Sequence, residues 1–200
     1  MEWFYKGLSG LLLLVYLLII GRYLKKHKKQ QESVGAAMLS NNTATVLLVI
    51  TLLGFVVPQG LYVFTNLLDW ATIVTSTAVR FAGLFIYQLG LVLFFTSNES
   101  LGSNWWSAPE IGRNPHLAKE TIYGYMRHPI YTSVYIVLIG CMMVSGNWFI
   151  GVCSILPFTA LCIIRIPIEE KVLQRKMGDS YADYRIATGL FLPKFFNRGK

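Results

Sequence analysis

The feature that most constrains this chain is a series of apolar blocks, each about as long as a membrane is thick. A helix needs about 20 mostly apolar residues to cross the hydrocarbon core of a bilayer. Hydrophobic residues make up 54% of the 200 residues and charged residues only 14%, which is unlike a soluble domain. The sequence therefore predicts an all-α integral membrane protein with about five transmembrane helices, at about residues 5–24, 43–65, 78–96, 129–145 and 148–166.

The last two predicted spans are separated only by Gly146 and Asn147. Such a short link predicts an antiparallel helical hairpin over residues 129–166. Pro167 is expected to end the last span and to begin a separate short helix in the tail. The chain then divides into three N-terminal transmembrane helices, residues 1–96, and a second region, residues 97–200, which holds a polar loop at 97–128, the hairpin and the tail.

The basic residues lie beside the apolar blocks, where they set the orientation of a membrane protein. They give the chain a net charge of +8, but the sequence has no zinc-finger spacing or RNA-binding box, so nucleic-acid binding is not expected. The basic linker at residues 25–42 is predicted to be cytoplasmic, which leaves the N-terminus outside. Five crossings then place the 97–128 loop and the C-terminal tail in the cytoplasm. The first block is expected to remain as an anchor.

Some residues inside the blocks have simpler expected roles. The three cysteines lie in apolar runs without the spacing of metal ligands, so no metal site is predicted. Arg80 is expected to extend its side chain toward water at the membrane surface. Gly83, Gly90 and Gly140 are predicted to mark close helix contacts.

Ionisable residues gather at the two ends of the predicted hairpin, which a two-residue turn must bring together. We therefore expect six side chains to converge at one membrane boundary: Arg127, His128, Tyr131, Arg165, Glu169 and Glu170. Polar groups that converge at such a boundary are candidates for a ligand site. A simpler interpretation stays open, in which the acids complement a helix dipole and Arg165 anchors the interface.

The same region resembles a known family, the isoprenylcysteine carboxyl methyltransferases, together with the related small phospholipid methyltransferases. The resemblance covers residues 101–195, and it rests on Arg127-His128-Pro129-Ile130-Tyr131, Glu169-Glu170, Gly178-Asp-Ser-Tyr181-Ala-Asp-Tyr184 and Phe191-Leu-Pro193. The chain departs from the family at Thr132-Ser133, where a glycine often follows the tyrosine. It also has Ala118 and Thr121 in a loop that often has valine and glycine.

The resemblance implies a membrane enzyme that uses S-adenosylmethionine, bound in a cytoplasmic pocket formed by the 97–128 loop and the C-terminal helices. The implied cofactor-binding residues are Pro115, His116, Leu117, Ala118, Tyr123, His128, Pro129, Ile130, Tyr131, Glu169 and Glu170. Arg165 and Arg127 are the implied catalytic residues, and Arg165 would hold an acceptor carboxylate. The expected acceptor is a lipophilic molecule from the bilayer, with an isoprenylcysteine-like carboxylate as the leading candidate. Membrane lipids are the other expected partners, and no obligate protein partner is evident.

Two alternatives stay open. Membrane sterol-type reductases that use NADPH have a similar element, but theirs usually continues as Asn-Tyr and then Gly-Glu, whereas this chain has Ile130-Tyr131 and Thr132-Ser133. The other alternative is a non-catalytic membrane scaffold whose boundary charges only fix its topology. Trp105 and Trp106 are compatible either with an acceptor tunnel or with a loop anchor.

Overall fold

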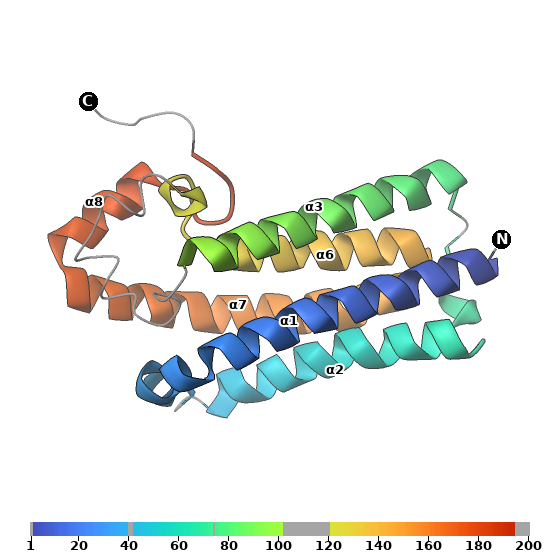
Figure 1. Ribbon diagram of the computed structural model, residues 1–200, viewed down its shortest axis with the longest axis horizontal. Coiled ribbons are helices and arrows are strands. Elements are labelled where there is room, and N and C mark those ends of the chain that lie inside the picture. The colour runs from blue at the N-terminus through green and yellow to red at the C-terminus, as the bar shows by residue number, and fades with distance from the viewer. Residues whose placement is uncertain (1, 40–41, 74, 102–120, 195–200) are drawn as a thin grey trace.

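The computed structural model describes every residue except 1, 40–41, 74, 102–120 and 195–200, and it leaves the side chains of residues 24–45 and 176 undescribed. Its described part is a bundle of long helices without a β-strand, which confirms the all-α prediction (Figure 1). The helices are α1 (Glu2–Leu39), α2 (Asn42–Phe64), α3 (Thr77–Leu101), α6 (Pro129–Ser145), α7 (Trp148–Met177) and α8 (Asp179–Ala187), with 3-10 turns η1 (Asp69–Ala71) and η3 (Ile122–Gly124).

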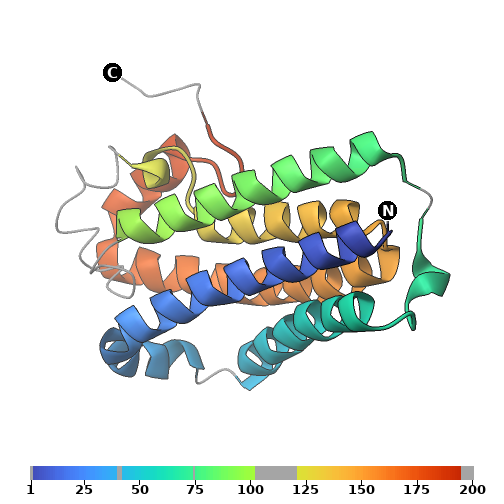
Figure 2. The ribbon, with the colours of Figure 1, turned by 45° about the vertical axis from the view of Figure 1, so that its right-hand side comes forward.

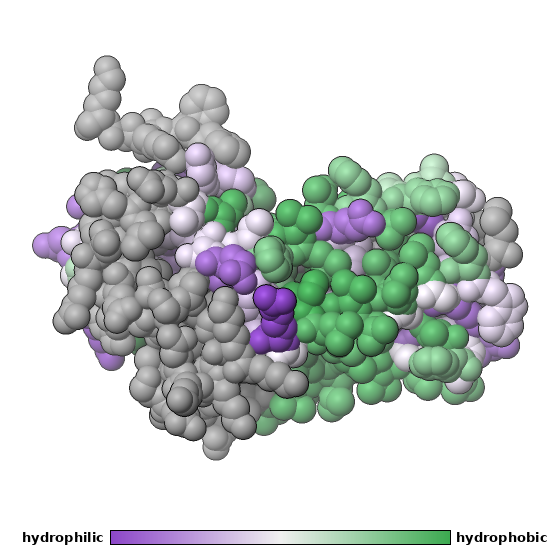
Figure 3. Space-filling view, in the orientation of Figure 1, coloured by the Kyte–Doolittle hydropathy of each residue, from purple (hydrophilic) through white to green (hydrophobic). Residues whose placement is uncertain are grey.

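Four described helices are long and apolar enough to cross a membrane. They are α1 over Glu2–Tyr23, α2 over Val46–Phe64, α3 over Thr77–Ser100 and α7 over Trp148–Arg175, and α6 is a shorter apolar helix of 17 residues. Large apolar side chains such as those of Val92, Leu156 and Ile163 are exposed on the outside of the bundle. Figure 3 shows such residues as a broad apolar surface over the middle of the molecule. The chain is therefore a multi-pass membrane protein.

The turn between α6 and α7 confirms the predicted hairpin. Gly146 ends α6 in the left-handed conformation, with φ of 60°, which a residue with a side chain rarely adopts. Asn147 then begins α7, because its side chain accepts a hydrogen bond from the amide of Ile150. The same side chain donates to the carbonyl oxygen of Leu68 at 2.8 Å, which ties the turn to the end of the bundle where α2 finishes.

Helices α3 and α6 pack closely along their length, because glycines allow their backbones to approach. A Cβ atom added at Gly83 would lie 2.5 Å from the Cβ of Met143, and one added at Gly90 would lie 2.8 Å from the amide nitrogen of Val137. On α6, Gly140 faces the backbone of Tyr87 in the same way. These contacts confirm the predicted roles of the three glycines. They also fix an antiparallel register, visible in Figure 2, where α3 and α6 run side by side.

The structure corrects the predicted helix boundaries at two places. The break expected at Pro167 does not occur, because α7 continues through Pro157 and Pro167 to Met177. Membrane helices tolerate proline because neighbouring groups satisfy the freed carbonyls. The polar linker expected after the first span is helical as far as Leu39. Its lysine, glutamine, glutamate and alanine residues are good helix formers, and a charged segment can remain helical beyond the apolar block.

The expectation for Arg80 is also wrong. Its side chain is only 5% exposed, donates to Glu2 at 2.8 Å and stacks over the ring of Tyr5 at 4.3 Å. The partner carboxylate lies on α1, so the guanidinium is held inside the bundle by an ion pair rather than extended into water. This contact closes the end of the bundle that lies near the N-terminus.

Candidate functional site

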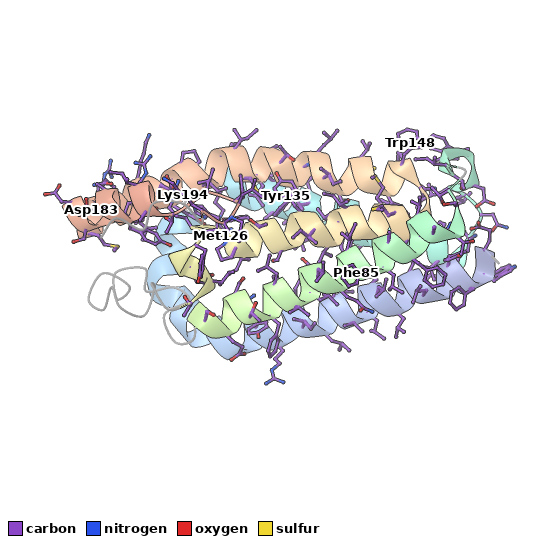
Figure 4. All side chains as sticks on the ribbon, turned by 90° about the horizontal axis from the view of Figure 1, so that it is seen from above. Phe85, Met126, Tyr135, Trp148, Asp183 and Lys194 are labelled. Carbon is purple, nitrogen blue, oxygen red and sulfur yellow. The ribbon has the colours of Figure 1, made fainter. Side chains whose placement is uncertain are left out.

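The candidate site lies where α6 begins and α7 extends past it, which we call the site end. In Figure 4, Met126 and Lys194 lie toward this end with Asp183 beyond them, whereas Trp148 lies at the opposite end of the bundle. The hairpin turn is at that opposite end, so the first residues of α6 meet the last turns of α7. The lengths of the two helices thus determine which of their side chains meet at the site end.

Glu169 is the centre of the first group of contacts. Its Oε1 accepts a hydrogen bond from the Tyr131 hydroxyl at 2.8 Å and another from the Arg165 Nε at 2.7 Å. Its Oε2 lies 3.9 Å from the Nδ1 of His128. The carboxylate is mostly buried, so these charge-assisted contacts act at a low local dielectric.

Arg127 and Glu170 form the second group. The Nε of Arg127 donates to Glu170 at 2.8 Å, and its Nη1 donates to the carbonyl oxygens of Arg185 at 2.9 Å and Thr188 at 2.6 Å. The backbone amide of Arg127 also donates to the carbonyl of Gly189 at 2.8 Å. A single guanidinium fork therefore binds the end of α8, and the following segment, to the start of α6.

We predict that Arg127→Ala releases the segment after α8 from the bundle. The Arg127 side chain donates to the carbonyl oxygens of Arg185 and Thr188, and its removal also leaves Glu170 without its closest cation. Chymotrypsin should then cleave near Phe191 about 10 times faster than in the unmodified protein. Loss of charged hydrogen bonds worth about 1.5 kcal/mol or more raises the population of the state in which the segment has left the bundle by at least that factor.

Arg185→Ala is the matched control for this prediction. Its guanidinium is half exposed and lies 3.4 Å from Glu170, so its removal should change the cleavage rate little. Equal cleavage rates in the two variants would show that Arg127 does not hold the segment.

His128 precedes α6 and is buried, with 7% of its surface exposed. Burial lowers its pKa below the usual 6.5, while the carboxylates of Glu169 and Glu170 oppose that shift. Nε2 lies 3.4 Å from Glu170 but has no hydrogen-bond partner of suitable geometry in the part of the chain that the structure describes. A buried ring nitrogen without a partner indicates that a polar ligand group belongs there.

Aromatic rings surround this polar cluster. Tyr123 is buried on η3, and its carbonyl oxygen accepts a hydrogen bond from the hydroxyl of Tyr184 at 2.8 Å. On α6, the ring of Tyr131 lies 5.5 Å from that of His128. The aromatic contacts continue from Tyr131 to Phe158 on α7 and Tyr135 on α6, and from Tyr135 to Phe191 in the segment after α8. The site is thus polar at the membrane boundary and apolar on its bilayer side.

These contacts confirm that the six side chains expected to converge do so. Pro129 and Ile130 form the first turn of α6 beside them, and Tyr123 lies on the adjoining η3. The roles assigned to all of these residues in binding and catalysis stay predictions. Pro115, His116, Leu117 and Ala118 lie outside the described residues, as do Trp105 and Trp106.

Sequence reasoning did not assign a role to three further residues at the site end. Tyr181 and Tyr184 belong to the motif that carries the resemblance, and the structure buries Tyr181 and half-buries Tyr184 near the cluster, where burial raises the pKa of each hydroxyl. The buried Tyr181 hydroxyl has no hydrogen-bond partner among the described residues. Asn98, on α3, is fully buried, and no local sequence signal distinguishes it from a polar residue that simply ends a membrane span.

Comparison with known proteins gives consistent results. The sequence pattern of the phospholipid methyltransferase family matches residues 78–180. This range begins in α3 and includes the hairpin and the cluster around Glu169. The match therefore covers the part of the chain that forms the candidate site.

Three individual relatives are between 29% and 36% identical to this chain over part of its length. A protein-S-isoprenylcysteine O-methyltransferase of Schizosaccharomyces pombe is 36% identical over 69 residues, which are 34% of this chain and 29% of that protein. A methanethiol S-methyltransferase of Mycobacterium tuberculosis is 29% identical over 130 residues, which are 63% and 46% of the two chains. Protein-S-isoprenylcysteine O-methyltransferase B of Arabidopsis thaliana is 29% identical over 112 residues, or 54% and 57%. The matches thus span between 29% and 57% of the lengths of these relatives.

Proposed function

Because this chain belongs to the phospholipid methyltransferase family, we propose that it is a membrane enzyme that transfers a methyl group from S-adenosylmethionine to a lipophilic acceptor. The observation that carries this proposal is the cluster of Glu169, His128 and Arg165 at one boundary of the bundle. Fixing the orientation of a membrane protein does not require an ion-pair network of this kind. The network therefore weighs against a non-catalytic scaffold.

The residues of the cluster fit the cofactor. A bound S-adenosylmethionine supplies an electrophilic methyl group on a sulfonium sulfur. The carboxylates of Glu169 and Glu170 are suited to its ammonium group or ribose hydroxyls, and the unpartnered Nε2 of His128 is suited to another polar group. Tyr123 and Tyr131 offer aromatic faces for the adenine or the sulfonium. The cytoplasm supplies this cofactor, so we propose that the site end is cytoplasmic, as the basic residues predict.

We propose that the acceptor is an isoprenylcysteine-like carboxylate. Two relatives carry that activity in their names, and Arg165 provides the chemistry to hold a carboxylate. Its Nε binds Glu169, while its two terminal nitrogens donate to no described residue. They can therefore contact a second carboxylate through two parallel hydrogen bonds. A carboxylate is already a nucleophile at neutral pH, so the protein needs to orient it and exclude water rather than deprotonate it.

Calorimetric titration of the detergent-solubilised protein with S-adenosylhomocysteine tests the reaction class, with NADPH titrated in parallel. We expect saturable binding of S-adenosylhomocysteine alone. Binding of NADPH alone would favour a sterol-type reductase, and binding of neither would favour the scaffold. The two titrations therefore separate all three functions that the sequence leaves open.

We predict that Arg165→Ala lowers turnover of a farnesylated cysteine substrate by about 100-fold, because two charge-assisted hydrogen bonds to the acceptor are lost. Arg165→Lys should recover only part of this activity, since lysine lacks the planar fork. Methyl incorporation from radiolabelled S-adenosylmethionine measures the effect. Affinity for S-adenosylhomocysteine, measured on the same samples, should change much less. Full turnover in the alanine variant would exclude Arg165 as the acceptor-binding residue.

A further inference from the structure

Asn98 carries an unsatisfied polar atom at the site end of α3. Its side chain is completely buried. The Nδ2 donates to the carbonyl oxygen of Phe94, one turn earlier, at 2.6 Å, but the Oδ1 has no hydrogen-bond partner among the described residues. The neighbouring buried Ser97 differs, because its hydroxyl donates to the carbonyl oxygen of Leu93 at 2.6 Å.

The register of α3 and α6 places Asn98 at the same level of the bundle as the first residues of α6. Gly83 faces Met143 and Val144, Gly90 faces Val137, and each step along α3 is matched by one step back along α6. Continued to the site end, this register sets Asn98 opposite Pro129, the residue after His128. The η3 turn, which carries Tyr123, also packs against α3. Asn98 thus lies at the same level of the bundle as the start of α6.

A buried carbonyl oxygen without a partner is unfavourable unless a bound group donates to it. Two further buried polar atoms at the site end have no hydrogen-bond partner among the described residues, the Nε2 of His128 and the hydroxyl of Tyr181. Three such atoms at one end of the bundle indicate a polar ligand rather than an isolated packing defect. The Oδ1 can only accept, so the ligand group that it faces must be a hydroxyl or an amine.

We propose that Asn98 recognises the adenine of the cofactor by accepting a hydrogen bond from its exocyclic amine. This inference rests on the proposed function. A carboxamide that reads the edge of a base, next to an aromatic ring that contacts its face, is a general mode of adenine recognition. Tyr123 is positioned to supply that ring. The bond from Nδ2 to Phe94 fixes which atom of the amide faces the ligand, so the amide cannot flip to donate to a ligand carbonyl without losing that bond.

Two probes that differ only at the amine test the proposal. They are S-adenosylhomocysteine and S-inosylhomocysteine, in which a carbonyl oxygen replaces the amine. The unmodified protein should bind the first about 10-fold more tightly, because the second places two acceptors opposite each other. In Asn98→Leu, which keeps the size of the side chain, this ratio should fall to about 1. Ser97→Ala, the adjacent control, should keep the original ratio.

Equal affinity of the unmodified protein for the two probes would overturn the proposal without any variant, as would an unchanged ratio in Asn98→Leu. A uniform loss of affinity for both probes, with the ratio preserved, would assign Asn98 to packing or to the ribose and would equally overturn it. Failure of the proposed function appears differently, since the unmodified protein would then bind neither probe.

Discussion

Replacing Glu169 by glutamine should weaken binding of S-adenosylhomocysteine by about 100-fold, because it removes the proposed charge partner of the ligand's ammonium group, and truncating one partner of a buried charge pair across an interface costs about 2–5 kcal/mol. The carboxylate accepts hydrogen bonds from Tyr131 and Arg165 and faces His128. Glutamine keeps the shape but leaves the guanidinium without its counter-charge. Calorimetric titration measures the change. His128→Ala should give a smaller loss of about 10-fold, as expected for one hydrogen bond.

Glu2→Gln provides the matched control for this prediction. Glu2 also pairs with a buried arginine, Arg80, at 2.8 Å, but at the opposite end of the bundle. Its replacement should lower stability and leave the affinity of the folded protein unchanged. If both Glu169→Gln and His128→Ala retained the original affinity, the cofactor would not bind in this cluster.

Replacing Gly140 by leucine should prevent α3 and α6 from packing. A Cβ atom there would lie 2.6 Å from the amide nitrogen of Tyr87 and 2.8 Å from the carbonyl oxygen of Gly83, both backbone atoms. Side chains can rotate away from such a contact, but two helix backbones must separate. We expect a loss of about 3 kcal/mol or more, seen as a decrease of about 10 °C in the thermal unfolding temperature of the detergent-solubilised protein.

Gly60→Ala is the control for the packing prediction. Gly60 also lies within a membrane helix, α2, but no heavy atom would lie within 4 Å of an added Cβ. This substitution should leave stability unchanged or raise it by up to about 1 kcal/mol, because alanine favours the helix more than glycine does. Equal unfolding temperatures for Gly140→Leu and Gly60→Ala would show that the close contact is not needed.

Local patterns predicted the parts of the fold that depend on solvent and on short connections. Apolar blocks of membrane length define the spans, and the two residues Gly146 and Asn147 leave room only for an antiparallel hairpin. The convergence of Arg127 with Glu170 follows from that hairpin alone. The error at Pro167 arose because proline is a strong local signal, whereas a membrane helix can continue through proline when neighbouring groups compensate.

Tertiary packing determined the contacts between distant residues, which no short-range sequence pattern predicts. Asn98 and Pro129 lie on either side of a segment that includes 19 undescribed residues, and they come to the same level of the bundle only because glycines on α3 and α6 set the register of the two helices. Arg80 is buried because the carboxylate of Glu2, 78 residues away in sequence, reaches it from α1. Sequence by itself determined which segments enter the membrane and which residue types gather at their ends, because hydrophobicity acts on each segment separately. The particular atoms that remain without partners, and thus the most informative part of the site, depend on how separate helices approach one another.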